Sequence, residues 1–351
     1  LDQVKLIAVD HPDSVAVYVD ERFVPPAPTA LRLYQVSRPR PPVSATDERG
    51  RDLLPALRAP DDVYTGPLLP GRFQGTTEPH DMILDLGRGA PTDSEFLVLR
   101  GWVFPTDASI NVAMSQSAGS PVIAPSLEVQ DARGRWRMAI PDLGFPSGKD
   151  KTLIVDLTGK FPGADRRVRI RTTMDIHWDE AFVAGSVSKS PVRISSLDPA
   201  VASLDYRGFS RMYRKGGRAG PHWFDYDAVS TEPRWLPIDG FLTRFGDVLA
   251  LLSDADDRYV VMGPGDQTTV DFAADGVAPL PAGWTRDFLI YSVGWIKDGD
   301  YNTAHGGTVA PLPFHGMTRY PYGAGDRYPG DALHRKYLET YNTRAAAGLP
   351  R

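Results

Sequence analysis

The chain has 351 residues, a net charge of −5 at neutral pH and no cysteine. This composition excludes disulfides and thiolate metal sites, and a chain without a net positive charge is not expected to bind nucleic acid. No apolar run approaches the roughly 20 residues that a membrane-spanning helix needs, so we expect no transmembrane segment. The 33 glycines and 32 prolines indicate many short strands joined by turns.

The first 80 residues, 1–80, are expected to form an N-terminal hairpin followed by a proline-rich connector. Residues 4–9 and 15–19 are two apolar runs separated by a short polar turn, and this pattern predicts two paired strands. Prolines then crowd residues 25–42, which favours an extended segment over a packed element. The chain starts with Leu1 rather than methionine, and we expect that a signal peptide or a whole domain precedes it in the gene product.

Residues 81–190 carry the strongest strand signal in the chain. Short runs that alternate apolar and polar residues are bounded by glycine, proline or aspartate, which is typical of half-buried antiparallel strands. These runs cover residues 96–103, 126–131, 134–140, 151–157 and 167–172. We therefore predict a central β-sandwich, in which the small, polar segment 106–125 is a loop that either builds a ligand site or forms a plain surface excursion.

A second sandwich is predicted over residues 191–305, and a strap with a short helix over residues 306–351. The second sandwich would use strands at residues 247–252, 258–262, 268–272 and 286–292. An aspartate followed by apolar residues at helical spacing predicts one helix over residues 331–347. The predicted fold is all-β, with two antiparallel, jelly-roll-like β-sandwich domains, long proline- and glycine-rich loops and one short C-terminal helix.

The sequence contains no catalytic signature that we can identify. It has no Gly-x-Ser-x-Gly elbow, no phosphate-binding Walker loop, no dinucleotide-binding glycine fingerprint after a strand and no His-Glu-x-x-His zinc motif. Paired carboxylates for glycoside hydrolysis stay open, since their separation is a property of the folded chain. We therefore predict a protein that is not an enzyme, with a glycoside-active enzyme as the least favoured alternative.

A metal site is one interpretation of the segment that ends the central sandwich. Asp175, His177 and Asp179 alternate along one predicted strand, so their side chains would share one face of the sheet. Carboxylate and imidazole groups in this arrangement can bind a metal ion. The same alternation of polar residues also occurs at a solvated edge of a sandwich, so the pattern supports both interpretations.

A second acidic segment begins like a calcium-binding loop. Asp298, Asp300 and Asn302 place oxygen ligands at alternate positions, but the glycine at the sixth position and the glutamate at the twelfth are missing, which excludes an EF-hand. A looser calcium site is the remaining metal interpretation, and we expect either no cofactor or calcium. The acidic run at residues 254–257 is predicted to be a solvated turn.

Four tryptophans are the candidate ligand-binding residues. Trp102, Trp178, Trp223 and Trp295 are large aromatic side chains that could stack against sugar rings, because aromatic residues dominate pockets and interfaces. A tryptophan at the end of a core strand is also a common core residue. These residues therefore support a carbohydrate-binding module as an alternative function.

Five runs in the chain resemble a known family. They are VKLIAVDHP at residues 4–12, PPVSATDERGRD at 41–52, FQG at 73–75, MDIHWD at 174–179 and LPFHGM at 312–317. These runs resemble the C-terminal region of large bacterial proteins with FG-GAP repeats, of the cartilage-acidic-protein-like type. The resemblance implies an upstream β-propeller and export from the cytoplasm, although the propeller's aspartate-rich repeats do not occur in this sequence. The strand rhythm also resembles galactose-binding-like jelly rolls, which implies binding of carbohydrate or of a partner.

These observations favour a non-catalytic, periplasmic or extracellular β-sandwich protein that acts as a structural or protein-interaction subunit of a larger envelope or surface assembly. Its expected partners are other protein subunits. The extended segments at residues 25–42 and 306–330 are suited to lie on a neighbouring protein. A carbohydrate-binding module is the alternative, and it should expose two or three tryptophans in a groove, whereas an assembly subunit should expose an apolar patch.

Overall fold

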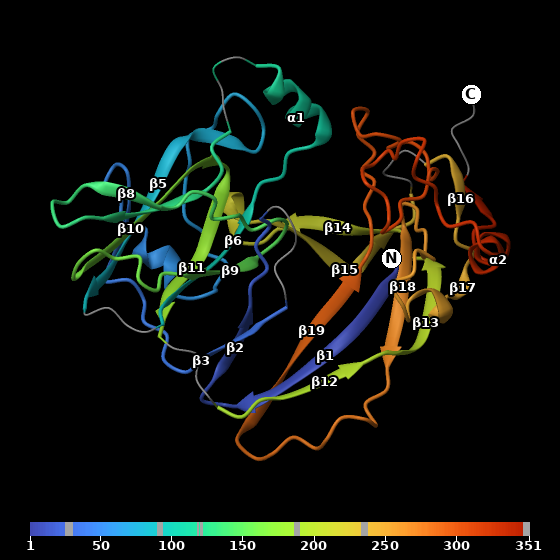
Figure 1. Ribbon diagram of the computed structural model, residues 1–351, viewed down its shortest axis with the longest axis horizontal. Helices are drawn as coiled ribbons and strands as arrows, with labels where there is room; N and C mark the ends of the chain where they lie inside the picture. The colour runs from blue at the N-terminus through green and yellow to red at the C-terminus, as the bar shows by residue number, and fades with distance from the viewer. Residues whose placement is uncertain are drawn as a thin grey trace. The chain divides into compact units, whose positions relative to one another are not determined.

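A computed structural model describes residues 1–24, 31–89, 94–117, 119, 122–185, 190–232 and 238–346. The predicted all-β class is confirmed, because the regular elements of these residues are mostly strands, with two α-helices (Figure 1). The chain forms two compact units. Unit 1 comprises Leu1–Pro12, Val192–Arg211 and Phe224–Arg351, and unit 2 comprises Asp13–Pro191 and Met212–Trp223.

Unit 2 contains two antiparallel sheets that enclose one core. The larger sheet has the strand order β4-β5-β10-β7-β8, and the smaller has the order β11-β6-β9. A separate pair is formed by β2 and β3. The strands are β2 (Ala16–Val19), β3 (Leu33–Val36), β4 (Ser44–Asp47), β5 (Thr76–Arg88), β6 (Phe96–Val103), β7 (Ser126–Gln130), β8 (Trp136–Ile140), β9 (Lys151–Asp156), β10 (Asp165–Met174) and β11 (Ile176–Ala184). The short helices of this unit are the 3₁₀ turns η1 (Leu54–Leu57) and η2 (Gly217–Ala219) and the α-helix α1 (Ala108–Ser115).

The core of unit 2 draws on both sheets, as expected for a β-sandwich. Leu84 and Leu127 of the larger sheet and Leu99 and Leu153 of the smaller sheet are fully buried in one hydrophobic cluster. Burial of each such leucine stabilises the folded chain by about 1.5–3 kcal/mol. The smaller sheet is also covered on its outer face, where Phe182 packs in a second cluster. Burial on both faces explains why β6, the central strand of this sheet, is apolar at nearly every position.

The segment 106–125 was predicted to be a loop, and this prediction is wrong for its first half, which forms α1. Asp107 caps the helix, because its side chain accepts a hydrogen bond from the backbone N–H of Ile110 at 2.7 Å. None of the residues of α1 is buried. The helix therefore lacks the apolar stripe from which it could have been recognised in the sequence.

Unit 1 is built from several small sheets and one helix. One sheet has the strand order β12-β1-β19, a second has the order β17-β13-β18, and β16 pairs with β20. The strands are β1 (Gln3–Pro12), β12 (Arg193–Leu197), β13 (Pro199–Tyr206), β16 (Gly240–Leu242), β17 (Gly246–Asp247), β18 (Asp266–Phe272), β19 (Trp284–Val293) and β20 (Arg344–Ala346). The helices are the 3₁₀ turn η3 (Leu249–Leu251) and α2 (Ala332–Thr340). β14 (Phe209–Arg214) pairs with β15 (His222–Ser230), and these two strands lie between β13 and β16 in the chain, with residues in both units.

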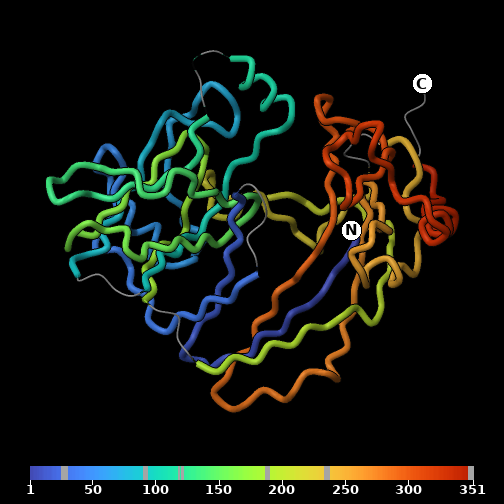
Figure 2. Tube along the Cα trace, viewed as in Figure 1, coloured from blue at the N-terminus to red at the C-terminus, as the bar shows by residue number. Residues whose placement is uncertain are grey.

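The core of unit 1 is a second, separate cluster. Leu204 of β13, Leu251 of η3 and Tyr337 of α2 are buried together in it. The Tyr337 hydroxyl donates a hydrogen bond to the Tyr259 carbonyl oxygen at 2.7 Å, which satisfies the polar end of this buried ring. The colour ramp of Figure 2 shows that the strands of this unit come from both ends of the chain.

The predicted C-terminal helix is present, although its end was placed too late. The Asp331 side chain caps α2 by accepting hydrogen bonds from the backbone N–H groups of Leu333 and His334. The helix ends at Thr340, and β20 follows it. Residue 347 of the predicted range lies outside the described residues.

The predicted hairpin between residues 4–9 and 15–19 is wrong. β1 pairs antiparallel with β12 and β19, so that Leu6 lies opposite Leu197 on one side and Ile290 on the other. β2 pairs instead with β3. Long-range pairing therefore overrides the local turn signal, and β1 belongs to a unit that the chain re-enters only after residue 191.

The division of the chain also differs from the predicted domains 1–80, 81–190, 191–305 and 306–351. Residues 13–80 belong to the same unit as the central sandwich, and residues 306–346 belong to the same unit as the segment 224–305. Of the strands predicted in this second region, 268–272 and 286–292 are found in β18 and β19. Residues 258–262 form no strand, and 247–252 is mostly the 3₁₀ turn η3.

Candidate functional site

The sheet β12-β1-β19 of unit 1 ends in a long edge strand. β1 is the central strand, so β12 and β19 are the two outer ones. Within the described part of the chain, β19 has no partner on its outer side. β19 is ten residues long, and all ten pair with β1. An edge strand of this length offers a row of backbone N–H and C=O groups to another strand.

The same edge strand exposes two large apolar side chains on one face. Ile290 is 75% exposed and Phe288 is 58% exposed. The register places Ile290 beside Leu6, Leu6 beside Leu197, and Phe288 beside Ala8. We call Leu6, Leu197, Phe288 and Ile290 the β19 patch. Because side chains alternate along a strand, the members of the patch lie on one face of the sheet.

An ion pair and a histidine–aspartate contact fix the register of this sheet at the far end of β1. Arg286 of β19 donates to both carboxylate oxygens of Asp10, at 2.5 and 2.8 Å. His11 lies on the other face of β1, and its Nε2 atom is 3.0 Å from a carboxylate oxygen of Asp287. The arginine holds the pKa of the Asp10 carboxyl below its usual value. A fixed register keeps the apolar residues of the patch on one face.

Unit 1 also contains an open cleft of about 880 Å³. Its lining is mainly apolar, with a few polar groups among which Asp239, His305 and Glu339 are charged or titratable. Phe241 of β16 is one lining residue, and its side chain is 58% exposed. A cleft of this size and lining can accept a small apolar ligand.

A lysine holds one wall of this cleft. The Lys297 ammonium donates hydrogen bonds to the carbonyl oxygens of Thr308, Val309 and Pro311 at 3.1, 2.7 and 3.0 Å. Three backbone acceptors match the three donors of an ammonium group. The segment that carries these carbonyls also lines the cleft, so Lys297 positions that segment.

Two of the four candidate stacking tryptophans are buried, so the prediction that they bind a ligand is wrong for them. Trp102 is 4% exposed and Trp178 is 3% exposed. Trp178 belongs to the core of unit 2. Trp102 stacks on His177, and its indole N–H donates to the Ala219 carbonyl oxygen at 2.9 Å. Both lie on strands of the smaller sheet, whose two faces are covered.

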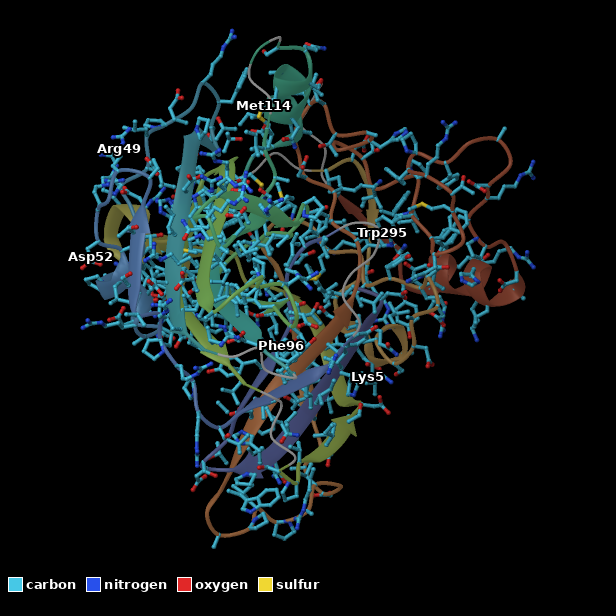
Figure 3. All side chains as sticks on the ribbon, turned by 60° about the vertical axis from the view of Figure 1, so that its left-hand side comes forward. Lys5, Arg49, Asp52, Phe96, Met114 and Trp295 are labelled. Carbon is cyan, nitrogen blue, oxygen red and sulfur yellow. The ribbon has the colours of Figure 1, made fainter. Side chains whose placement is uncertain are left out.

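The other two tryptophans differ from each other. The ring of Trp223 is covered by two ammonium groups, since Lys149 and Lys215 lie 4.8 and 5.0 Å from its centroid. Trp295 is 47% exposed and follows the end of β19 (Figure 3). Of the four predicted residues, Trp295 alone therefore presents an exposed ring without such a cation contact among the described residues.

The acidic loop predicted to bind calcium folds around its own hydrogen bonds. A carboxylate oxygen of Asp298 accepts from the backbone N–H of Asp300 at 3.1 Å and also binds the Thr303 hydroxyl. A carboxylate oxygen of Asp300 accepts from the backbone N–H of Asn302 at 2.8 Å. Such contacts shape turns in many proteins without an ion. The calcium assignment at this loop stays a prediction.

The three residues of the other predicted metal site are divided between two environments. Nε2 of His177 lies 3.1 Å from a carboxylate oxygen of Asp175, and its Nδ1 lies 2.9 Å from the Thr65 carbonyl oxygen. Asp179 instead lies near Arg100. The three residues do not form one of the close groups of metal-ligating atoms found in the described residues. A bulge between Trp178 and Glu180 interrupts the regular alternation there.

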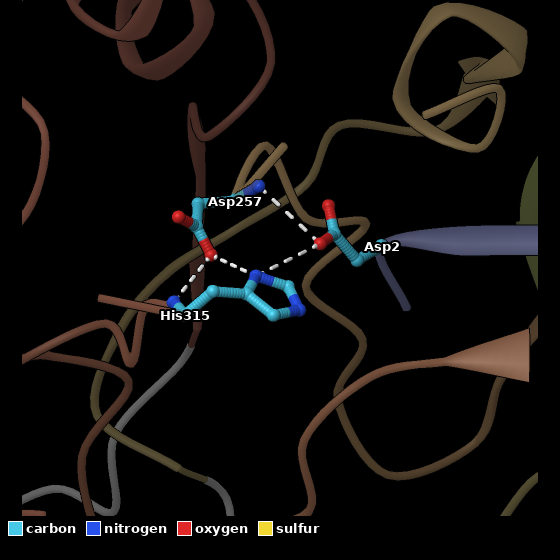
Figure 4. A group of neighbouring side chains, drawn as sticks. All are labelled: Asp2, Asp257 and His315. Carbon is cyan, nitrogen blue, oxygen red and sulfur yellow. Dashed lines mark hydrogen bonds and ion pairs between the residues drawn. The ribbon is translucent and has the colours of Figure 1, made fainter. Parts of the chain in front are cut away.

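The close group that does occur consists of Asp2, Asp257 and His315 in unit 1 (Figure 4). Nδ1 of His315 lies 2.6 Å from a carboxylate oxygen of Asp257 and 3.7 Å from one of Asp2. Asp2 is fully buried, and burial raises the pKa of its carboxyl. Its two oxygens accept hydrogen bonds from the backbone N–H groups of Asp256 and Asp257.

The ligand atoms of this group are already bound to donors of the protein itself. One oxygen of Asp257 accepts from the backbone N–H and the ring of His315 and from the Tyr259 hydroxyl. A metal ion would have to displace these donors, so we interpret the group as a structural network. It joins the start of β1 to two distant loops. The prediction of a solvated turn at residues 254–257 is wrong for Asp257, which is 9% exposed.

The sequence did not predict the exposed apolar face of β19 or the network that joins Asp2 to Asp257. The alternation at residues 286–292 predicted a strand, yet it gave no sign that Phe288 and Ile290 are on an exposed face. Nothing local in the sequence relates Asp2 to Asp257, because the two residues are far apart in the chain. Among the described residues, no helix is both long and apolar enough to cross a bilayer, as expected from the sequence.

In comparisons with protein-family models, with curated proteins and with solved structures, the chain has no match. The resemblance to FG-GAP-repeat proteins and to galactose-binding-like jelly rolls therefore stays a prediction from the sequence.

Proposed function

We propose that the chain is a non-catalytic, extracytoplasmic subunit that binds another protein chain along β19. The observation that carries this proposal is the combination of an open edge strand with the exposed β19 patch. The partner would add an extended strand to the edge and place its own apolar side chains over Phe288 and Ile290. The extracytoplasmic location is supported only by the resemblance to exported proteins.

Burial of the β19 patch by a partner would lower the free energy of the complex. Burial of one isoleucine or phenylalanine is worth about 1.5–3 kcal/mol, and the exposed fractions of Ile290 and Phe288 scale this to roughly 2–4 kcal/mol for the two together. Backbone pairing along the edge adds hydrogen bonds to this gain. A long, exposed apolar edge is also an aggregation site in a free chain, which gives a further reason for a partner.

The alternative functions have less support. Of the four predicted stacking tryptophans, Trp102 and Trp178 are buried and Trp223 is covered by lysine ammonium groups. A carbohydrate-binding module would then depend on Trp295 as its stacking residue. A glycoside-active enzyme would have to use Asp239 and Glu339, the two carboxylates that line the cleft.

The proposal is tested by purifying the native protein from its source without denaturant and identifying every chain that accompanies it. We expect a stoichiometric complex with a second protein. A photo-crosslinking residue at position 290 should then join the two chains. A species that contains only copies of this chain would overturn the proposal.

Two variants of the same strand sharpen the test. Ile290→Lys places a charge in the β19 patch and should weaken binding of the identified partner at least about tenfold, because about 1.4 kcal/mol corresponds to a factor of ten. Tyr291→Lys is the matched control, since Tyr291 is 43% exposed on the opposite face of the same strand. Equal loss of affinity in both variants would contradict the assignment of the patch as the contact.

A further inference from the structure

The bulge in β11 holds a buried carboxylate without a hydrogen-bond partner. β11 pairs with β6, and the register shifts between Trp178 and Glu180, which leaves Asp179 as the extra residue. Asp179 is 0% exposed, and neither of its carboxylate oxygens has a hydrogen-bond partner among the described residues. A buried, unpaired carboxylate is strongly unfavourable, so a group that satisfies these oxygens is to be expected.

A second carboxylate lies across the same sheet. In the order β11-β6-β9, Asp179 comes from one outer strand and Asp150 directly precedes the other, with Arg100 on the central strand between them. The Arg100 guanidinium lies 3.9 Å from an oxygen of Asp179 and 3.6 Å from one of Asp150. Both distances are longer than a hydrogen bond, so Arg100 does not satisfy either oxygen directly. The Asp150 side chain is 6% exposed.

Tyr64 and Asp62, from a loop of the same unit, lie beside Asp150. The Tyr64 hydroxyl donates to Asp150, with its oxygen 2.9 and 3.1 Å from the two carboxylate oxygens, and it lies 3.5 Å from an oxygen of Asp62. Lys215 pairs with Asp62 at 2.6 Å. Gly216 packs so closely on this loop that a Cβ atom there would be 2.3 Å from the Asp62 carbonyl oxygen.

Asp179 and Asp150 bring two carboxylates to one guanidinium, that of Arg100. Among the groups that act on Asp179 most strongly, three carboxylates, of Asp150, Asp62 and Asp61, oppose its ionisation, and the Arg100 guanidinium favours it. Together with burial, which is the largest cause, they raise the pKa of the Asp179 carboxyl to about 6. A water molecule could satisfy the unpaired oxygens of Asp179, but it would leave the two carboxylates of Asp179 and Asp150 beside the single positive charge of Arg100.

We propose that Asp179 and Asp150 bind a calcium ion beside Arg100, with water completing the coordination. Asp62 pairs with Lys215 and forms no close group of ligand atoms with these two carboxylates among the described residues. A cation satisfies the two orphaned oxygens and offsets the negative charge at once. All candidate ligands are oxygen atoms, which suits a hard cation and not zinc. Calcium accepts six to eight oxygens in irregular geometry, whereas magnesium requires a near-ideal octahedron, so this uneven cluster favours calcium.

The site is distinct from the loop at Asp298, and it does not depend on the proposed protein-binding function. Both residues that carry it lie within unit 2, whereas the loop and the β19 patch lie in unit 1. One carboxylate oxygen each of Asp298 and Asp300 accepts hydrogen bonds within that loop, whereas neither oxygen of Asp179 has a hydrogen-bond partner among the described residues.

The test measures calcium binding to the full chain after removal of metal with a chelator. Calorimetric titration with calcium chloride at neutral pH should show one site per chain. Asp179→Asn keeps the shape of the side chain and removes its charge, and it should weaken this binding at least about tenfold. Asp298→Asn is the matched control and should bind calcium as the wild type does.

Thermal unfolding distinguishes an Asp179 that binds calcium from an Asp179 that has only a structural role. In the chelator, Asp179→Asn should unfold at a higher temperature than the wild type, because it removes a buried unpaired charge. In calcium, the order should reverse, because only the wild type gains stability from the ion. Asp150→Asn gives a second variant with the same expected loss of affinity if Asp179→Asn does not fold.

Three results would overturn the proposal. The first is a chelated wild type that does not bind calcium. The second is binding that is lost in Asp298→Asn and retained in both Asp179→Asn and Asp150→Asn. The third is a wild type whose stability increases as the pH falls through about 6 and is unchanged by calcium, since a proton would then be the group that satisfies Asp179.

Discussion

Gly101 of β6 lies directly against the neighbouring strand β11 in the smaller sheet of unit 2, and we predict that Gly101→Ala destabilises this unit strongly. A Cβ atom at this position would lie 2.4 Å from the His177 carbonyl oxygen and 2.8 Å from Cε3 of Trp178. Gly101 pairs directly with Trp178. The obstacle is therefore mainly backbone and a buried indole, neither of which can move aside as a flexible side chain would.

The magnitude follows from the cost of overpacking. Extra atoms in a packed core typically cost about 1–3 kcal/mol, and the upper end applies where the backbone must shift. For a unit of this size, about 1 kcal/mol lowers the melting temperature by about 2–4 °C, so Gly101→Ala should lower it by about 6–12 °C. Gly101→Val adds two more methyl groups at the same place and should unfold the unit or lower its melting temperature further.

Differential scanning calorimetry and the fluorescence of the buried Trp178 would measure the effect. Gly163→Ala is the matched control, because a Cβ atom at Gly163 meets nothing within 4 Å and its backbone is not in the left-handed region. A melting temperature that changes by less than about 1 °C in Gly101→Ala would show that the strands can separate at little cost, and the reasoning would be refuted.

Three further predictions concern buried polar groups. Glu95→Gln should destabilise unit 2 by about 3–5 kcal/mol in urea unfolding, because it leaves Arg166, whose side chain is 5% exposed, without its charged partner. Lys297→Met should increase amide hydrogen exchange in residues 306–312, since three carbonyl oxygens lose their donor. Burial raises the pKa of the Asp2 carboxyl in the folded chain above its unfolded value of about 3.9. The protonated carboxyl therefore stabilises the folded chain fully below about pH 3.9, and this stabilisation is lost as the pH rises through the folded-state pKa. Asp2→Asn should remove this pH dependence of the free energy of unfolding.

Each of these predictions has a control or a contradicting result. Asp85→Asn removes a surface partner of Arg167 and should cost less than about 1 kcal/mol, so an equal effect of Glu95→Gln would contradict the role of burial. Unchanged exchange in Lys297→Met would show that the segment is held by other contacts. A stability profile of Asp2→Asn that matches the wild type across pH would exclude Asp2 as the titrating group.

The strands of the central sandwich could be predicted because their signal is local. The predicted runs 96–103, 126–131 and 151–157 agree with β6, β7 and β9 to within one residue. Each run is bounded by turn residues, and alternation over five to eight residues is enough to mark it. The pairing of β1 with β12 and β19 was not predictable in this way, because a strand sequence does not name its partner.

The ligand-binding residues were predicted less well than the strands, because both faces of β6 and β11 are covered. On a sheet buried on both faces, an aromatic residue at any position is a core residue, so Trp102 and Trp178 carried no information about a ligand. The alternation of Asp175, His177 and Asp179 suggested a metal site from the sequence, and metal binding by Asp179 stays a prediction. The sequence could not show that a bulge separates Asp179 from His177 or that Asp150 would be its neighbour across the sheet.

Both proposals depend on residues whose burial is the reverse of what their chemistry favours. Ile290 is apolar and 75% exposed, and Asp179 is charged and 0% exposed. Each state is unfavourable for the isolated chain, and each is relieved by a different partner, a protein segment for Ile290 and a cation for Asp179. Because the two residues belong to separate units, we expect their effects to add. Ile290→Lys should therefore leave the calcium affinity unchanged, and a shared loss of both activities in either single variant would mean that unfolding, and not a site, explains it.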